Sequence, residues 1–210
     1  PRLAERLGQP VIIDNRSGAG GNLAVEAIAK SAPDGYTIGF GVSGSLTINV
    51  TLQPNLPYDS VRDLTPITMA VNNPLILVSS TSFPARDVRE LAALARSKPD
   101  PIAFGSGGNG TAMHLAGELL KQTAGINLVH VPYKGTNPAV NDLVGGQIPL
   151  AIVDVASALK FIKAGRIHAL GVTGAKRAEM AADIPTISES GAPGFYVQSW
   201  FGVIAPARLP

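Results

Sequence analysis

The chain has 210 residues, of which 45% are hydrophobic and 15% are charged, with 17 basic residues against 15 acidic ones. This composition is typical of a globular chain with a real core and excludes a disordered segment. The basic residues are scattered, and no apolar run reaches the ~18 residues of a membrane helix, so we expect neither nucleic acid as a partner nor direct membrane insertion. The lack of cysteine excludes disulfides, thiolate nucleophiles and cysteine-ligated metals.

The first segment, PRLAERLGQPVIIDN, predicts the last turns of a helix that stops at Gly8, followed by a short buried strand at Val11–Ile13. Because a chain rarely begins in the last turns of a helix, we expect residues to be missing before Pro1. No signal peptide is visible in the chain. The segment DNRSGAGGN leads into a helix at Leu23–Lys30, with Asn22 as its possible cap, because apolar residues recur there at i, i+3 and i+4.

A turn in APDGYTIGFG then predicts a strand, which ends in a loop containing Ser43 and Gly44. The same order recurs later, with a strand at Ile102–Phe104, the glycine-rich GSGGNG, a helix at Thr111–Thr123 and a strand in NLVHV. Two such units predict two α/β lobes with parallel sheets.

The remaining segments keep the alternation of strands and helices. Strands are expected at 75–78, 150–153 and 168–173 and within FYVQSWFGVIAPA, and helices within DVRELAALARSKP, where Asp87 is a possible cap, and at 156–164. The fold class is therefore α/β throughout.

The segment FGSGGNGTAMH, residues 104–114, places glycines between a strand and a helix start. The first amides of a helix are unpaired and carry partial positive charge, so such a loop can bind phosphate or carboxylate. Ser106, Asn109 and Thr111 add polar side chains. The glycines also match G-x-G-x-x-G, but the acidic residue that dinucleotide binding needs after the next strand is absent. A loop that only permits a tight turn remains the alternative.

The sequence gives little sign of catalysis. His114 precedes Glu118 by four residues, which indicates a side-chain pair on a helix surface, while His130 and His168 lie in strand-like runs. A set of Ser106, His114 and Asp154 can be imagined, but no spacing supports it. We expect no enzyme, no metal and no cofactor. Asp154 ends an apolar strand, where it can either cap the next helix or accept hydrogen bonds from a ligand.

Three segments together resemble one known family: RLGQPVIIDNRSGAGGNLAVEAIAKSAPDGYTIGFG, FGSGGNGTAMHLAGELLKQTAGINLVHVPYKGTNPAVNDLVGGQ and SWFGVIAPA. They are similar to the substrate-binding receptors of tripartite tricarboxylate transporters, the Bug-type periplasmic receptors, over essentially the whole chain. The resemblance implies a periplasmic-binding-protein fold with a ligand cleft between two lobes. One lobe would hold residues 1–79 and 198–210 and the other residues 80–197, with crossings near Leu77–Thr81 and Val197–Phe201. Family members also have an N-terminal strand and loop, and further C-terminal helices, which we expect to be missing here, as they would be if the sequence is a fragment.

The resemblance also implies the ligand-binding residues. They are Ser106, Gly107, Gly108, Asn109, Gly110, Thr111 and Asp154, and more loosely Ser43, Gly44 and Tyr133. In the family, loop amides and waters hold the ligand's carboxylate, and the strand-end aspartate can meet an amino or hydroxyl group. Because arginine and lysine are scarce near these loops, we expect neutral amides to capture the anion.

The expected function is that of a periplasmic receptor that delivers a small carboxylate to membrane permease subunits. The carboxylate would be a mono-, di- or tricarboxylate, an amino acid or an aromatic acid. Two alternatives stay open: an enzyme that binds a phosphorylated substrate at the same loop, and the effector domain of a regulator.

Overall fold

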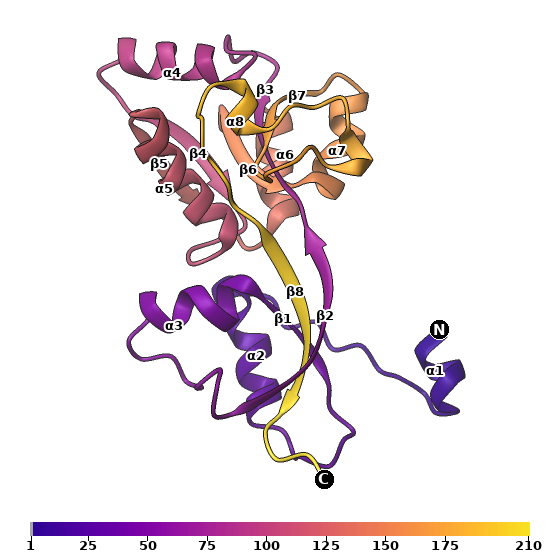
Figure 1. The fold of residues 1–210 in the computed structure, drawn as a ribbon. Coiled ribbons are helices and arrows are strands. Elements are labelled where there is room, and N and C mark those ends of the chain that lie inside the picture. The colour runs from indigo at the N-terminus through magenta and orange to yellow at the C-terminus, as the bar shows by residue number, and fades with distance from the viewer. Residues whose placement is uncertain (1) are drawn as a thin grey trace.

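In the computed structural model, which describes residues 2–210, two long antiparallel strands connect two bodies (Figure 1). These strands are β2 (Leu64–Asn73) and β8 (Ser199–Pro206), and their register pairs Leu64 with Pro206 and Asn73 with Ser199. β1 (Gly39–Val42) pairs antiparallel with the other edge of β8, which gives a three-stranded sheet in the order β1-β8-β2.

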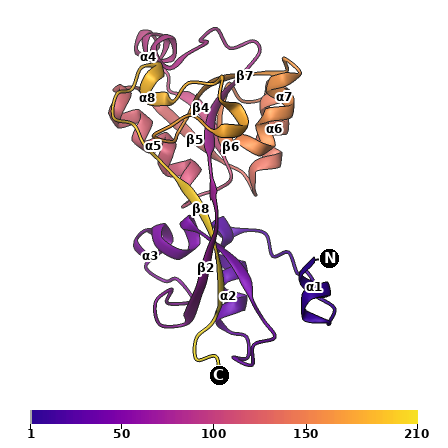
Figure 2. The same cartoon turned by 45° about the vertical axis from the view of Figure 1, so that its right-hand side comes forward.

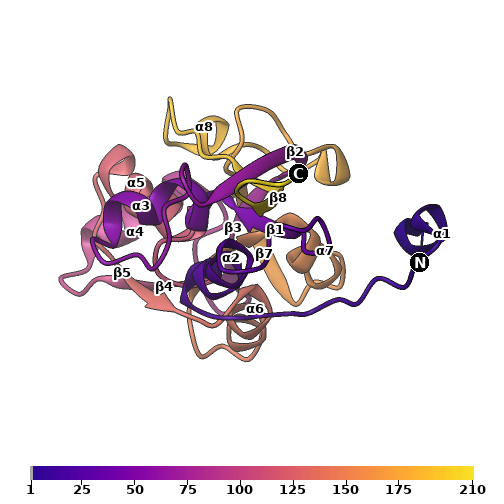
Figure 3. The ribbon, with the colours of Figure 1, turned by 90° about the horizontal axis from the view of Figure 1, so that it is seen from below.

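The first body surrounds this small sheet. Its helices are α1 (Arg2–Leu7), η1 (Ala19–Gly21), α2 (Asn22–Ala29), η2 (Gly44–Ile48) and α3 (Asn49–Leu52). A small core of Val25, Ile28, Tyr58, Leu64 and Ile204 joins α2 to the sheet. α1 buries no residue, and an extended segment separates it from the rest (Figure 3).

The prediction of a strand at Val11–Ile13 is wrong. No secondary structure forms there, and the residues Ile12 and Ile13 are 90% and 80% exposed. No described strand pairs with this segment, and an unpaired strand gains no ladder hydrogen bonds to offset the entropy of ordering it. β1 therefore has no parallel partner, and the expected parallel sheet of the first lobe is instead antiparallel.

The second body holds a mixed five-stranded sheet in the order β5-β4-β6-β3-β7. β4 pairs parallel with β5 and β6, while β3 pairs antiparallel with β6 and β7. The strands are β3 (Leu75–Ser80), β4 (Ile102–Ser106), β5 (Leu128–Pro132), β6 (Leu150–Asp154) and β7 (Ile167–Val172).

Helices cover both faces of this sheet (Figure 2). All six residues of β3 are buried, and they alternate between a core with α4 and α5 (Leu75, Leu77) and a core with α6 and α7 (Ile76, Val78). Burial on both faces explains why β3 reads as a continuous apolar run. The helices are α4 (Val88–Ser97), α5 (Ala112–Ala124), α6 (Thr136–Val144), α7 (Val155–Lys163), η3 (Glu179–Ala181) and α8 (Ile187–Ser190).

The chain passes between the two sheets at Asn73–Pro74 and again just before Ser199. The expected crossing at Leu77–Thr81 lies later than this first passage, because β3 already belongs to the five-stranded sheet. Thr173 ties the second passage to the large body: its N–H donates to the Leu75 carbonyl, and its carbonyl accepts from the Val197 N–H, both at 2.9 Å. The division into lobes at 79/80 and 197/198 stays a prediction. None of the described helices has the length and hydropathy needed to cross a bilayer.

Candidate functional site

A cavity of about 560 Å³ lies between the two bodies, and both of them line it. The first body contributes the segment 16–21, the end of β1 with the start of η2, and Asn73 at the end of β2. The second body contributes parts of the segments 107–113 and 132–136, and Ser199 and Phe201 come from β8. A molecule held in this cavity therefore touches both bodies at once.

The glycine loop, Gly105–Gly110, reaches the cavity because of its backbone conformation. Gly108 and Gly110 have φ angles of 129° and 71°, which β-carbon-bearing residues rarely adopt. Thr111 caps α5: its Oγ1 accepts from the His114 N–H at 3.2 Å and donates to the Gly108 carbonyl at 2.8 Å. The N–H groups of the first α5 residues, Ala112 and Met113, have no partner within the helix, and both residues line the cavity.

Two more helix starts meet the same cavity. α6 begins after Gly135, and both Gly135 and Thr136 line the cavity. α2 begins after Gly21, which lines the cavity from the first body. Three N-terminal helix ends thus bring partial positive charge to one space. The sequence reasoning missed α6, although Pro138 in the first turn after a glycine is a typical sign of a helix start.

Two charged side chains stand among the described residues that line the cavity, and both are cations: Arg16 and Lys134. Arg16 lies on the first body and pairs with Asp14 at 2.8 Å, whereas Lys134 lies on the second body. The expected scarcity of arginine and lysine near these loops therefore does not hold for this cavity, and capture of the anion by neutral amides stays a prediction. Arg16 in NRSGAGG and Lys134 in YKG both lie next to glycine-containing motifs. This proximity is the sequence signal that could have placed the two cations at the cavity.

The structure brings most of the expected ligand-binding residues together. The cavity is lined by Ser43, Gly44, Gly107, Gly108, Asn109, Thr111 and Tyr133, but not by Ser106, Gly110 or Asp154. The loop expected at Ser43 and Gly44 is instead the start of η2. The binding roles of all ten residues stay predictions.

Three of these side chains already have protein partners. The Asp154 carboxylate caps α7 by accepting from the Ser157 N–H at 2.9 Å. The Tyr133 hydroxyl donates to Asp142 Oδ2 at 2.8 Å, and burial together with this bond raises the pKa of Tyr133 to about 12. Ser106 is fully buried, and its Oγ accepts from the Gly108 N–H at 3.1 Å, so it holds the loop from behind.

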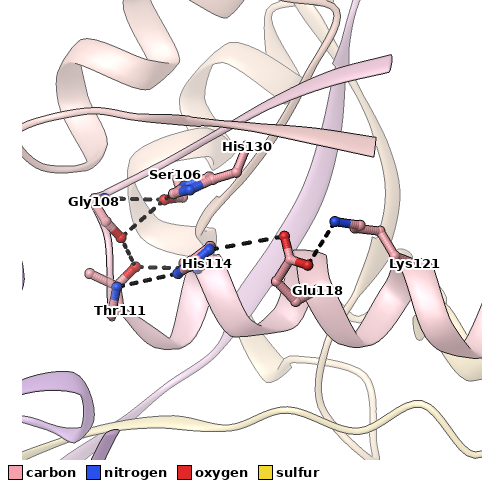
Figure 4. A network of polar contacts seen from close by, with 8 residues as sticks. Ser106, Gly108, Thr111, His114, Glu118, Lys121 and His130 are labelled. Atoms are coloured by element: carbon pink, nitrogen blue, oxygen red, sulfur yellow. Dashed lines mark hydrogen bonds and ion pairs between the residues drawn. The ribbon is translucent and has the colours of Figure 1, made fainter. Parts of the chain in front are cut away.

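Behind the loop, Ser106 contacts His130 rather than His114, with 2.6 Å between Oγ and Nε2 (Figure 4). The imagined set of Ser106, His114 and Asp154 does not form, because Ser106 Oγ contacts His130 and the hydrogen bond described for the Asp154 carboxylate comes from the Ser157 N–H. The expected pairing of His114 with Glu118 is present at 4.0 Å. Within residues 2–210, no three His, Asp or Glu side chains are placed to hold a metal ion.

A buried polar cluster supports the first-body wall. The Asn22 side chain accepts from Asn49 Nδ2 at 2.8 Å and donates to Gln53 Oε1 at 3.0 Å, and Gln53 lines the cavity. Asn22 is the first residue of α2 and gives no side-chain cap to it, so its expected capping role is wrong.

The two bodies also approach each other closely through backbone atoms. A β-carbon built on Gly44 would lie 2.6 Å from the carbonyl oxygen of Gly110, and one built on Gly20 would lie 2.7 Å from that of Asn109. These distances are too short for any side chain, so glycine is required for the observed approach of the bodies.

Comparison with known proteins gives a consistent result. A family model described as "Tripartite tricarboxylate transporter family receptor" matches residues 2–210. The UPF0065 protein in the tcbD-tcbE intergenic region of Pseudomonas sp. strain P51 is 41% identical over 210 residues, which is 100% of this chain and 62% of that protein. The chain thus spans about three fifths of the length of such curated relatives.

Two solved structures are also very similar. The R. palustris protein Rpa4515 with adipate is 38% identical, with a TM-score of 0.95 over 100% of this chain and 70% of that one. The periplasmic binding protein BugD is 35% identical, with a TM-score of 0.91 over 99% of this chain and 69% of that one. The expected fold class, with two α/β bodies joined by crossing segments, is confirmed.

Proposed function

The chain belongs to the family of tripartite tricarboxylate transporter receptors, and from this premise we propose that it is an extracytoplasmic receptor for a small carboxylate. The observation that carries the proposal is the cavity between the bodies, where helix N-termini converge and the charged lining residues are both cations. Such a site favours an anion through fixed amide dipoles and through charge.

The two walls give the ligand a means of closing the receptor. A carboxylate bound at the α5 and α6 starts touches the second body, and its other end reaches the segment 16–21 of the first. Because a ligand that contacts both bodies binds the closed arrangement more tightly, it shifts the equilibrium toward closure. The volume of about 560 Å³ suits a small metabolite.

Membership of the family supports a proposal for the partners and the location. We place the receptor in the periplasm, as with the relative BugD, and assign delivery of its ligand to the membrane permease subunits of the transporter. The adipate bound to Rpa4515 makes a dicarboxylate the first candidate ligand. In this proposal the ligand is held by Ser43, Gly44, Gly107, Gly108, Asn109, Thr111 and Tyr133. Asp154, which lies outside the cavity lining and caps α7, would meet an amino or hydroxyl group only of a ligand that extends beyond the cavity to the end of β6.

A thermal-shift and calorimetry panel tests the proposal with adipate, succinate, citrate, glutamate and benzoate, and with glucose 6-phosphate and glucose as controls. We expect at least one carboxylate to stabilise the protein, by about 2.7 kcal/mol at a hundredfold excess over its Kd. Indifference to every carboxylate would refute the proposal. Tighter binding or turnover of the phosphate ester would support the enzyme alternative instead.

A further inference from the structure

Two histidines lie face to face behind the glycine loop, outside the cavity. The rings of His114 on α5 and His130 on β5 stack with 4.0 Å between centroids and 17° between planes (Figure 4). Phe104 on β4 lies against His130, with 5.0 Å between ring centroids. His130 Nε2 contacts Ser106 Oγ, and Ser106 in turn binds both the N–H and the carbonyl of Gly108.

The hydrogen bond to Gly110 fixes the protonation of His114. A backbone N–H can only donate, and the Gly110 N–H points at His114 Nδ1 at 3.3 Å. Nδ1 must therefore carry a lone pair, which places the ring proton on Nε2, on the side of Glu118. A proton added to Nδ1 would set two N–H donors against each other. The Gly110 peptide could then no longer keep its position.

The surroundings keep this pair neutral at pH 7. Burial lowers the pKa of His114 below 6.5, and burial together with the nearby His114 lowers the pKa of His130 to about 4. The charged groups that face the pair are Glu118 and Lys121, both on α5, and they bind each other at 2.7 Å. His114 also occupies the first turn of α5, where the helix dipole disfavours a cation.

We propose, on the basis of the function proposed above, that the neutral His114–His130 pair positions the loop from Gly108 to Gly110 for ligand binding, and that protonation of His114 releases this loop. The loop carries Asn109, which lines the cavity, and the Gly110 carbonyl that touches Gly44 of the first body. Acid thus weakens both the anion site and the contact between the bodies. A protonated His114 adds little attraction for the ligand, because Glu118 faces its Nε2.

Calorimetry with adipate at pH 7.5 and pH 5.5 tests the effect on binding. The wild-type Kd should rise on acidification by less than about tenfold, because burial lowers the pKa of His114 below its ordinary value and only part of the protein carries the extra proton at pH 5.5. His114→Asn keeps an acceptor near the Nδ1 position without titrating, so its Kd should match the wild type at pH 7.5 and change much less at pH 5.5. His114→Leu, checked for folding by circular dichroism, should bind weakly at both pH values. An equal loss of affinity on acidification in wild type and in His114→Asn would refute the proposal, because the loss would then come from protonation of adipate itself.

A ligand-free measurement separates this inference from the proposed function. The ¹H–¹⁵N resonance of the Gly110 amide should titrate in wild type with a midpoint below pH 6.5 and stay constant in His114→Asn. A constant Gly110 resonance in wild type would overturn the inference whatever the protein binds. If the resonance titrates but no carboxylate binds, the coupling of His114 to the loop is supported and the receptor function is refuted.

Discussion

At the scale of single residues, the two cations that line the cavity bear on the number of negative charges in the proposed ligand. Arg16 and Lys134 line the cavity from opposite bodies, and we predict that each pairs with a different carboxylate of the ligand. The side chains of Arg16 and Asp14 are 55% and 65% exposed. Ion pairs on the surface contribute only about 0 to 1 kcal/mol to the free energy of folding. Arg16 is therefore available to turn toward a ligand at small cost.

We predict that Lys134→Gln weakens adipate binding about tenfold, because a charge-assisted contact to one carboxylate is lost. A monocarboxylate of similar length, hexanoate, should lose much less, since the helix N-termini still hold its single carboxylate. Calorimetry with both acids measures the difference, and Lys98→Gln, a lysine that does not line the cavity, serves as control. Equal losses for adipate and hexanoate would contradict the role of Lys134.

At the scale of elements, local signals predicted the second body well. The strand, glycine loop and helix around Ser106 and Thr111 could be predicted from the sequence. Helix caps and the 3.6-residue period of apolar positions are local signals that depend only on residues a few positions apart. The strand at Val11–Ile13 was not, because a strand exists only where a neighbour pairs with it, and pairing is a long-range property. The role of Ser106 likewise depends on His130, 24 residues away.

The seating of α5 on β4 depends on one glycine. A β-carbon on Gly117 would lie 2.2 Å from the ring of Phe104, a fully buried side chain. In an exposed helix, replacing glycine with alanine would raise the stability of the protein by about 1 kcal/mol through helix propensity. Here we predict that Gly117→Ala lowers the free energy of unfolding by about 1 to 2 kcal/mol, because overpacking a core costs more than the propensity gains.

Urea unfolding measures this effect, with Phe104→Leu alone as the reference. The double variant Gly117→Ala, Phe104→Leu should regain part of the loss, because the smaller side chain leaves room for the new methyl group. If Gly117→Ala were as stable as wild type, α5 would not be held against Phe104 as closely as the structure shows.

At the scale of the whole molecule, the relation between the two bodies was the least predictable feature. The resemblance predicted two lobes and a cleft, but the cleft depends on contacts between residues far apart in the sequence. Arg16 and Lys134 line it from opposite bodies, and Gly44 of one body lies against Gly110 of the other. Neither pairing leaves a local pattern, since glycine backbones and scattered cations carry no periodicity.

The contact between Gly44 and Gly110 gives a test of closure. Gly44 begins η2 and has an ordinary φ angle, so alanine there strains nothing within its own body. Its β-carbon would nevertheless lie 2.6 Å from the Gly110 carbonyl and 3.3 Å from Thr111 Cα, both of them backbone atoms of the other body. The bodies must then separate slightly, which favours the open arrangement.

We therefore predict that Gly44→Ala weakens adipate binding about tenfold. The free energy of unfolding of the ligand-free protein should stay nearly unchanged, because the new methyl group interferes only with closure of the two bodies. Small-angle scattering should show a larger radius of gyration for adipate-saturated Gly44→Ala than for saturated wild type, and similar values without ligand. Gly145→Ala is the matched control, since its β-carbon would meet its nearest neighbour, the Asn141 carbonyl oxygen, at an ordinary 3.4 Å. A Gly44→Ala protein that contracts as fully as wild type would show that ligand binding does not bring these two backbones together.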